Sequence, residues 1–202
     1  FRAASFVPAG AFAVPLFWQV LGIGYRKSKV AGTPDSWQAV LDSDAHKGRI
    51  ALLSDAADMF RLYAKYQGLS AAAMTPADIA RIEPMMVKQK PNVQSFNGGS
   101  GARLLQKGEA DLVIAANGDI ARIMADDPDI GFILPREGSL LASANLCVAK
   151  GTKHPKNAHA LIDYLLDGKS AMALFEANDL PITNAVARTS LGESYTENGV
   201  LS

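Results

Sequence analysis

Residues 112–116 form an apolar run with Val113 and Ile114 at its centre, and this run constrains the fold more than any other stretch. A short apolar run entered from a Gly-Glu turn predicts a buried strand of a parallel sheet. The next residues, Asn117-Gly118-Asp119, predict a turn into a helix. Because ligands of open α/β sheets bind outside the carboxyl ends of the strands, Asn117 and Asp119 are candidate ligand contacts. Asp119 can also be a helix N-cap, and the pattern alone favours the cap.

Short apolar runs alternate with helical patterns along the rest of the chain. Strands are predicted at 12–25, 50–53, 92–96, 130–134 and 140–148, and helices at 36–41, 56–66, 75–89, 102–107, from 155 onward and at 169–177. Pro15, Gly22 and Gly24 are expected to break the first strand, and Pro84 to bend or interrupt the third helix. The alternation predicts an α/β fold with a largely parallel sheet.

Composition excludes several classes of protein. With 202 residues, of which 49% are hydrophobic, the chain can bury a sizeable core. Its 20 basic and 20 acidic residues cancel, so nucleic acid is not an expected partner. Cys147, the only cysteine, lies in an apolar run and is expected to be buried. The three histidines are scattered, so neither a metal site nor a cofactor is predicted.

Two acids follow the predicted strand at 50–53. Asp55 and Asp58 are three residues apart at the start of a predicted helix. This spacing is typical of a helix cap and a solvated charge on the helix face, and equally of two ligand-binding carboxylates.

A series of short motifs stands in a fixed order along the chain. They are 13–18 with 22–25, 36–37, 47–50, 90–93, 108–109, 133–138, 157–160 and 164–166. Their order and spacing cover nearly all of residues 12–188, and together they resemble the polyamine-binding branch of the extracellular solute-binding proteins, the spermidine/putrescine receptors of bacterial ABC importers.

The resemblance implies a periplasmic binding protein-like fold of type II, in which two α/β lobes close on the ligand. Residues 1–14 would be the end of a missing first-lobe portion with a crossover, 15–125 the second lobe, and 126–202 a crossover and the C-terminal return to the first lobe. The chain would hold one near-complete lobe plus the C-terminal part of the other. Helices at 155–177 would then leave an apolar face uncovered.

The resemblance also implies where an amine would bind. The family's amine-binding acids correspond to Asp55, Asp58 and Asp119, and a small turn residue that contacts the ligand corresponds to Gly98, with Ser100 close by. A polyamine site needs carboxylates for its ammonium groups and aromatic faces for its methylenes.

Three positions depart from the family pattern. Ala116, Ala142 and Ala144 stand where the family has ligand-contacting aromatic residues and an aspartate. Since a buried ammonium needs its carboxylate, these alanines argue against an unmodified polyamine in the usual pose. Neutral hydrogen bonds from the following residues could replace the lost contacts: Ser143, Asn145 and Asn117.

The function implied is that of a substrate-binding component, without catalytic residues, that passes an amine-containing small molecule to the membrane permease of an ABC importer. The protein would be periplasmic or lipid-anchored outside the cell; no signal peptide is present, and the start at Phe1 suggests a processed or truncated product. One alternative is a bulkier amine, an amino acid derivative or a sugar conjugate as ligand. Another is a sensory or scaffold relative that binds no ligand. An enzyme with Cys147 as nucleophile is the least favoured.

Overall fold

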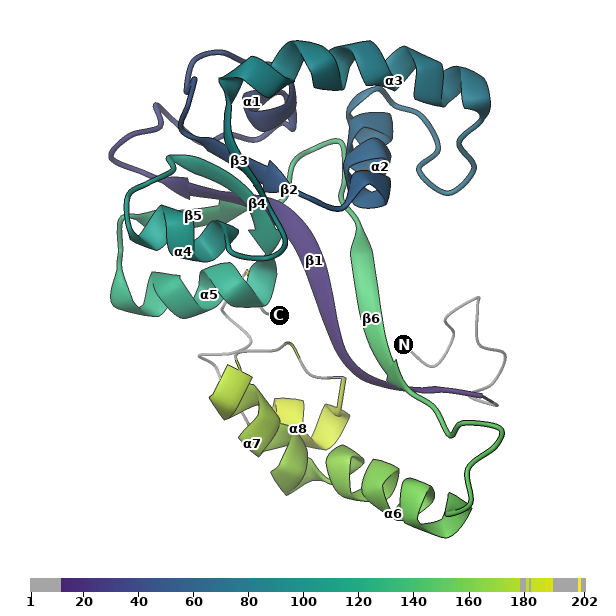
Figure 1. Cartoon of the computed structure of the whole chain (residues 1–202). Helices are drawn as coiled ribbons and strands as arrows, with labels where there is room; N and C mark the ends of the chain where they lie inside the picture. Colours follow the sequence, from purple (N-terminus) through teal and green to yellow (C-terminus); the bar gives the residue numbers. More distant parts are fainter. Residues whose placement is uncertain (1–11, 179–180, 182, 191–199, 201–202) are drawn as a thin grey trace. The chain divides into compact units, whose positions relative to one another are not determined.

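The computed structural model describes residues 12–178, 181, 183–190 and 200 (Figure 1). They divide into two compact units, each treated by itself below. Val20–Leu140 is the central unit, and the described residues before and after it form the flanking unit.

The elements follow the predicted alternation closely. They are β1 (Val14–Arg26), α1 (Gln38–Leu41), β2 (Ile50–Leu53), α2 (Ala56–Tyr66), α3 (Pro76–Gln89), η2 (Lys90–Asn92), β3 (Val93–Asn97), α4 (Gly101–Gln106), β4 (Leu112–Ala116), α5 (Asn117–Asp126), β5 (Ile130–Ile133), β6 (Leu141–Leu146), α6 (Pro155–Leu166), α7 (Gly168–Asn178) and α8 (Ala185–Ser190). None of the helices in the described ranges is both long enough and apolar enough to cross a membrane.

The sheet has the order β3-β2-β4-β1-β5, and β6 pairs with β1. β2 is parallel to β3 and β4, whereas β1 is antiparallel to both β4 and β5. The strands β2, β3, β4 and β5 therefore share one direction, and β1 lies between two of them in the opposite direction. The expectation of a largely parallel sheet holds for those four strands and is wrong for β1.

Helices cover both faces of this sheet in the central unit (Figure 1). Along β4, Leu112 and Ile114 pack in a cluster with residues of α1, α2 and α3, while Val113 and Ala115 pack in a second cluster with residues of α4 and α5. Because side chains alternate between the faces of a strand, a strand covered on both faces is apolar throughout. The run at 112–116 is buried for this reason.

Pro84 lies inside α3 without ending it, so the expected interruption is wrong. The helix begins with a capping box in which Thr75 and Asp78 exchange hydrogen bonds. Beyond Pro84, the buried Gln89 donates from Nε2 to the carbonyl oxygens of Val40 and Ser43, at 2.9 Å each. These contacts hold the second half of α3 in place and offset the lost helical hydrogen bond.

Gly22 and Gly24 also do not break β1, contrary to expectation. A Cβ at Gly24 would lie 2.6 Å from Cδ1 of Ile120, and one at Gly22 would overlap the ring of Phe132. The glycines leave room for side chains that pack on β1, so they mark close approach rather than a strand end.

Gly22→Ala is expected to lower the free energy of unfolding by about 1–3 kcal/mol, the usual effect of overpacking. The added Cβ would also lie 2.7 Å from the backbone oxygen of Ile133, which cannot rotate away. Urea denaturation would measure the change. Gly98→Ala is the matched control, because its Cβ would meet only Ser54 Oγ, at 3.5 Å. Equal stability of the two variants would contradict the packing explanation.

Two further expectations need correction. Cys147 is exposed rather than buried, because it comes directly after the end of β6. The lobe boundaries expected at 14/15 and 125/126 stay predictions; 14/15 lies within β1, and β5, which follows 125/126, pairs with β1 in the central unit. α8 lies where the pattern weakens and no helix was expected. The polar tail from 192 lies outside the described residues, apart from Val200.

The expected uncovered face is present in the flanking unit. No residue of α6 is buried, and Leu161 and Tyr164 are 58% and 66% exposed. Helix α6 therefore presents apolar side chains to solvent in this chain.

Candidate ligand-binding site

The carboxyl ends of β2, β3 and β4 meet at one edge of the sheet, because these neighbouring strands run in one direction. We call the segments that follow them, Ser54–Asp58, Gly98–Ser100 and Asn117–Asp119, the carboxyl edge. Ser54, in the first segment, donates from its backbone N to the carbonyl oxygen of Asn97, the residue before the second segment, at 2.9 Å. The structure thus places all the predicted site residues except Ser143 and Asn145 at one edge of the sheet.

Asp55 and Asp58 occupy the first turn of α2. Asp55 is its N-cap, and Oδ1 accepts a hydrogen bond from Asp58 N at 2.8 Å. Asp58 in turn pairs with Arg61, with 3.0 Å between Oδ1 and Nη1. Asp55 is therefore a helix cap and Asp58 a solvated charge on the helix, as one of the two interpretations predicts. Asp55 is exposed and the Asp58 side chain is 38% exposed, so both carboxylates are still accessible to a cation.

Asp119 is not a helix cap, so that interpretation is wrong. The N-cap of α5 is Ala116, which places Asp119 in the first helical turn. The residue is exposed by surface area, yet the protein around its carboxyl displaces enough water to raise the pKa above its ordinary value, while Arg122 acts in the opposite direction. A carboxylate in this position gains more than a fully hydrated one when a cation binds beside it.

Asn117 is fully buried, and its Oδ1 accepts a hydrogen bond from the backbone N of Val20 at 3.0 Å. Sequence reasoning placed this side chain at the ligand. Its burial and its bond to β1 favour an anchoring role instead.

Asn97 is a second buried amide at the carboxyl edge, and sequence reasoning missed it. Its Nδ2 donates to the carbonyl oxygen of Leu52 at 2.9 Å, and its Oδ1 accepts from Gly99 N at 3.1 Å. Gly99 has a φ of +115°, which favours glycine. The Asn-Gly-Gly sequence was the available signal, since asparagine commonly bonds the backbone two residues on. Asn97 shapes the loop that exposes Gly98 and Ser100.

Ser143 and Asn145 lie on β6 in the flanking unit. Asn145 Nδ2 donates to the backbone oxygen of Ser143 at 2.8 Å, and Ser143 Oγ is buried without a hydrogen-bond partner among the described residues. Strand alternation puts these two side chains on the face of β6 opposite to Ala142 and Ala144. Hydrogen bonds from Ser143 and Asn145 would therefore come from the face of β6 opposite to the one that the two alanines occupy, and the role of these residues at a ligand stays a prediction.

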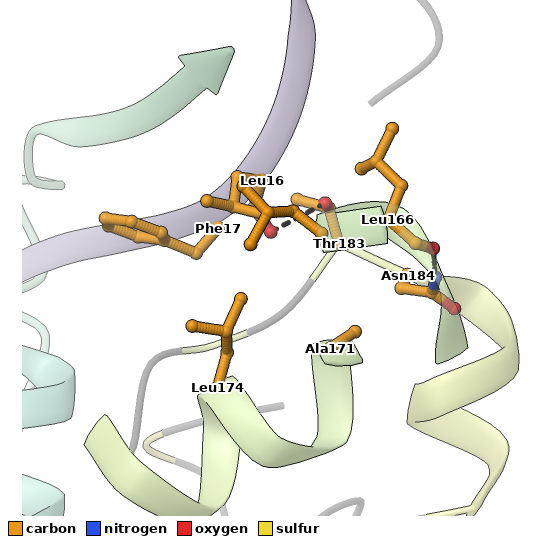
Figure 2. Close-up of a pocket in the computed structure, with 8 residues that line it drawn as sticks. Leu16, Phe17, Leu166, Ala171, Leu174, Thr183 and Asn184 are labelled. Atoms are coloured by element: carbon orange, nitrogen blue, oxygen red, sulfur yellow. Dashed lines mark hydrogen bonds between the residues drawn. The ribbon is translucent and has the colours of Figure 1, made fainter. Parts of the chain in front are cut away.

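A cavity in the flanking unit lies between the start of β1, α6 and α7 (Figure 2). It holds about 50 Å³ and is lined almost entirely by apolar side chains. Its polar side chains are already bonded: Thr183 Oγ1 donates to the carbonyl oxygen of Pro15 at 2.8 Å, and Asn184 Nδ2 to that of Leu166 at 2.6 Å. The cavity is too small and too apolar for a charged ligand such as a polyamine. In the described part of the chain, no group of three or more His, Cys, Asp or Glu is placed to hold a metal ion.

The mixed α/β architecture, with four strands in one direction and β1 against them, is that of a periplasmic binding protein-like fold. A solved structure bears this out: the spermidine/putrescine ABC transporter substrate-binding protein PotD from Streptococcus pneumoniae has a TM-score of 0.84 and 23% identity, covering 98% of this chain and 61% of that one. Residues 3–199 match the family described as bacterial extracellular solute-binding protein. The chain belongs to this family.

Curated relatives of the chain are named as binding proteins for small amines. The putrescine/cadaverine-binding protein of Pseudomonas aeruginosa is 28% identical over 195 residues, which cover 91% of this chain and 55% of the relative. The spermidine/putrescine-binding periplasmic protein of Escherichia coli is 26% identical over 196 residues, 97% of this chain and 56% of the relative. The chain spans about half the length of these two proteins.

Proposed function

We propose that this chain belongs to the substrate-binding component of an ABC importer and that its ligand is a polyamine or a related amine. The observation that carries the proposal is the convergence of Asp55, Asp58 and Asp119 at the carboxyl edge. The names of the relatives support the same class of ligand.

The placement of the acids favours a cation over an anion. Helices α2 and α5 both begin at the carboxyl edge, and a helix N-terminus ordinarily attracts anions. Here carboxylates occupy the first turn of each helix. They would repel an anionic ligand and attract an ammonium group, although Arg61 and Arg122 partly neutralise Asp58 and Asp119.

The ligand would be enclosed when the two units close, and the complex would deliver it to the membrane permease. The site would act by binding alone, without covalent chemistry. The protein would work in the periplasm or tethered outside the cell, as the relatives' names suggest.

A bulkier amine is the second candidate, and Ala116, Ala142 and Ala144 favour it. Small side chains where the family has aromatic residues and an aspartate would leave more room and less negative charge. An amino acid derivative or a sugar-conjugated amine would use that room.

Isothermal titration calorimetry of the complete gene product that contains these residues tests both candidates. Putrescine, spermidine and arginine are the amines, and succinate is the dicarboxylate control. Saturable binding of a diamine or triamine with no binding of succinate is the expected result. Tight binding of arginine alone would select the bulkier ligand. Binding of none would favour a ligand-free relative and overturn the proposal.

Amine affinity should fall as the pH drops through the raised pKa of Asp119. A bound ammonium favours the ionised carboxyl, so binding at that pH displaces a proton, and the loss begins above the ordinary carboxyl pKa of about 4. Calorimetry in two buffers of different ionisation enthalpy would count the released protons. Asp119→Asn should abolish the release; unchanged release in that variant would assign the proton to another group.

A further inference from the structure

Ser54 has a polar side chain at the carboxyl edge that neither the sequence patterns nor the fold has yet given a role. It directly follows β2 and directly precedes Asp55, the N-cap of α2. We propose that Ser54 is a further ligand contact, that its hydroxyl oxygen accepts a hydrogen bond from the ammonium group bound by Asp55 and Asp58, and that this end of the site selects a primary amine. The inference rests on the proposed function and names the class of amine bound there.

The backbone of Ser54 is fixed at the point where β2 ends. Its N donates to the carbonyl oxygen of Asn97 at 2.9 Å, and Asn97 Nδ2 donates to the carbonyl oxygen of Leu52 at the same distance. Ser54 therefore has a defined place between the start of α2 and the loop after β3, although the residue itself is exposed. A contact residue held on a rigid element positions its polar atom for a ligand.

The Ser54 hydroxyl does not serve the fold. A serine before a helix commonly caps it, but the cap of α2 is Asp55, whose Oδ1 accepts a hydrogen bond from Asp58 N at 2.8 Å. Within the described part of the chain, no group forms a hydrogen bond with Ser54 Oγ. The hydroxyl is left to water or to a ligand.

The closest position across from this hydroxyl is a glycine. A Cβ at Gly98 would lie 3.5 Å from Ser54 Oγ and would meet no other atom within 4 Å. Gly98 does not have a positive φ, so its backbone conformation does not require glycine. The missing side chain keeps one side of the hydroxyl open.

The number of free acceptor oxygens indicates the class of amine. Asp55 Oδ1 accepts from Asp58 N, and Asp58 Oδ1 accepts from Arg61 Nη1 at 3.0 Å, so each carboxylate keeps Oδ2 for a ligand. These two oxygens and Ser54 Oγ are three acceptors within one short segment. A primary ammonium group donates three hydrogen bonds, as the side chain of lysine does. A protonated secondary amine has one N–H fewer and would leave the hydroxyl without a donor.

Calorimetry of the complete gene product with two matched ligands tests this inference. Each charged end of putrescine carries three N–H bonds, and each end of N,N′-dimethylputrescine carries one fewer. Ser54→Ala is expected to raise the Kd for putrescine about 10-fold, the usual order for one hydrogen bond to a charged group. The Kd for N,N′-dimethylputrescine should stay within about two-fold of the wild-type value, because that ligand has no N–H left for the hydroxyl. The melting temperature should not change, since the hydroxyl bonds nothing in the described fold.

Ser70→Ala is the matched control, because Ser70 is an exposed serine beyond the other end of α2. It should leave the Kd of both ligands unchanged. A Kd for putrescine within about two-fold of wild type in Ser54→Ala, or an equal loss for the two ligands, would overturn the inference and leave the proposed function in place. Wild-type protein that binds no putrescine would also overturn the inference. Binding of arginine by that protein would leave the proposed function standing, whereas binding of no amine would overturn both.

Discussion

Asp119→Asn is expected to weaken putrescine binding about 100-fold, which corresponds to about 2.8 kcal/mol. The asparagine keeps the size and one oxygen of the side chain but removes the charge that would neutralise the ammonium. An ammonium enclosed without its counter-charge is left poorly solvated, and this penalty is larger than the value of the contact itself. Calorimetry of the complete gene product measures the loss directly.

The same substitution should not destabilise the unliganded protein at neutral pH. The raised pKa of Asp119 means that the folded protein favours the neutral form of this carboxyl. The neutral form therefore contributes fully to folding stability at low pH, and this contribution is lost as the pH rises through the folded-state pKa. At pH 7 the ionised carboxylate therefore lowers the free energy of unfolding, and asparagine removes this destabilisation. We expect a melting temperature equal to or above that of the wild type, together with the lost affinity.

Asp126→Asn is the control for this prediction. Asp126 is exposed and ends the same helix, so its substitution makes the same change in net charge away from the carboxyl edge. It should alter affinity less than two-fold at physiological salt, where exposed charges are screened. An equal loss in both variants would attribute the effect to the overall field of the protein and not to a contact with Asp119.

The sequence was informative about the candidate site wherever a strand and a helix are neighbours in the chain. The limits of β2, α2 and β4 follow from local apolar patterns. Asp55 and Asp58 follow β2 at the start of α2, and Asp119 follows β4 in the first turn of α5. Local pattern could not show that Ala116 rather than Asp119 is the N-cap of α5, since that depends on where helical geometry begins. The roles of these acids in binding stay predictions.

Residues whose partners are distant in the chain were beyond a reading of the sequence alone. Asn117 bonds Val20 across 97 positions, and Glu137 bonds Ser36 across 101. Local pattern predicts a strand break at Gly22, because its packing partner, Phe132, comes more than a hundred residues later. The apolar neighbours of Cys147 predict burial, although β6 ends one residue before it. Tertiary contacts decided each of these cases.

Trp37→Ala is expected to be the most destabilising substitution considered, lowering the free energy of unfolding by about 3–5 kcal/mol. Trp37 is fully buried in the core cluster that α1, α2 and α3 form with the sheet. Truncation would leave a cavity and also leave the Gly138 carbonyl without its indole donor. The free energy is measured by urea denaturation followed by circular dichroism.

Trp37→Phe separates the two parts of this effect, because it fills most of the cavity but cannot donate to Gly138. We expect it to lower the free energy of unfolding by about 1–3 kcal/mol, the usual result of leaving a buried polar group unpaired. Val87→Ala, at a position 63% exposed on α3, should change it by less than about 0.5 kcal/mol. If Trp37→Phe were as stable as the wild type, the bond to Gly138 would contribute nothing, and the turn at 135–138 would be held to this segment by Glu137, which accepts hydrogen bonds from Ser36 Oγ and Trp37 N. If it were as unstable as Trp37→Ala, the hydrogen bond and not the apolar contact would be the main link between α1 and that turn.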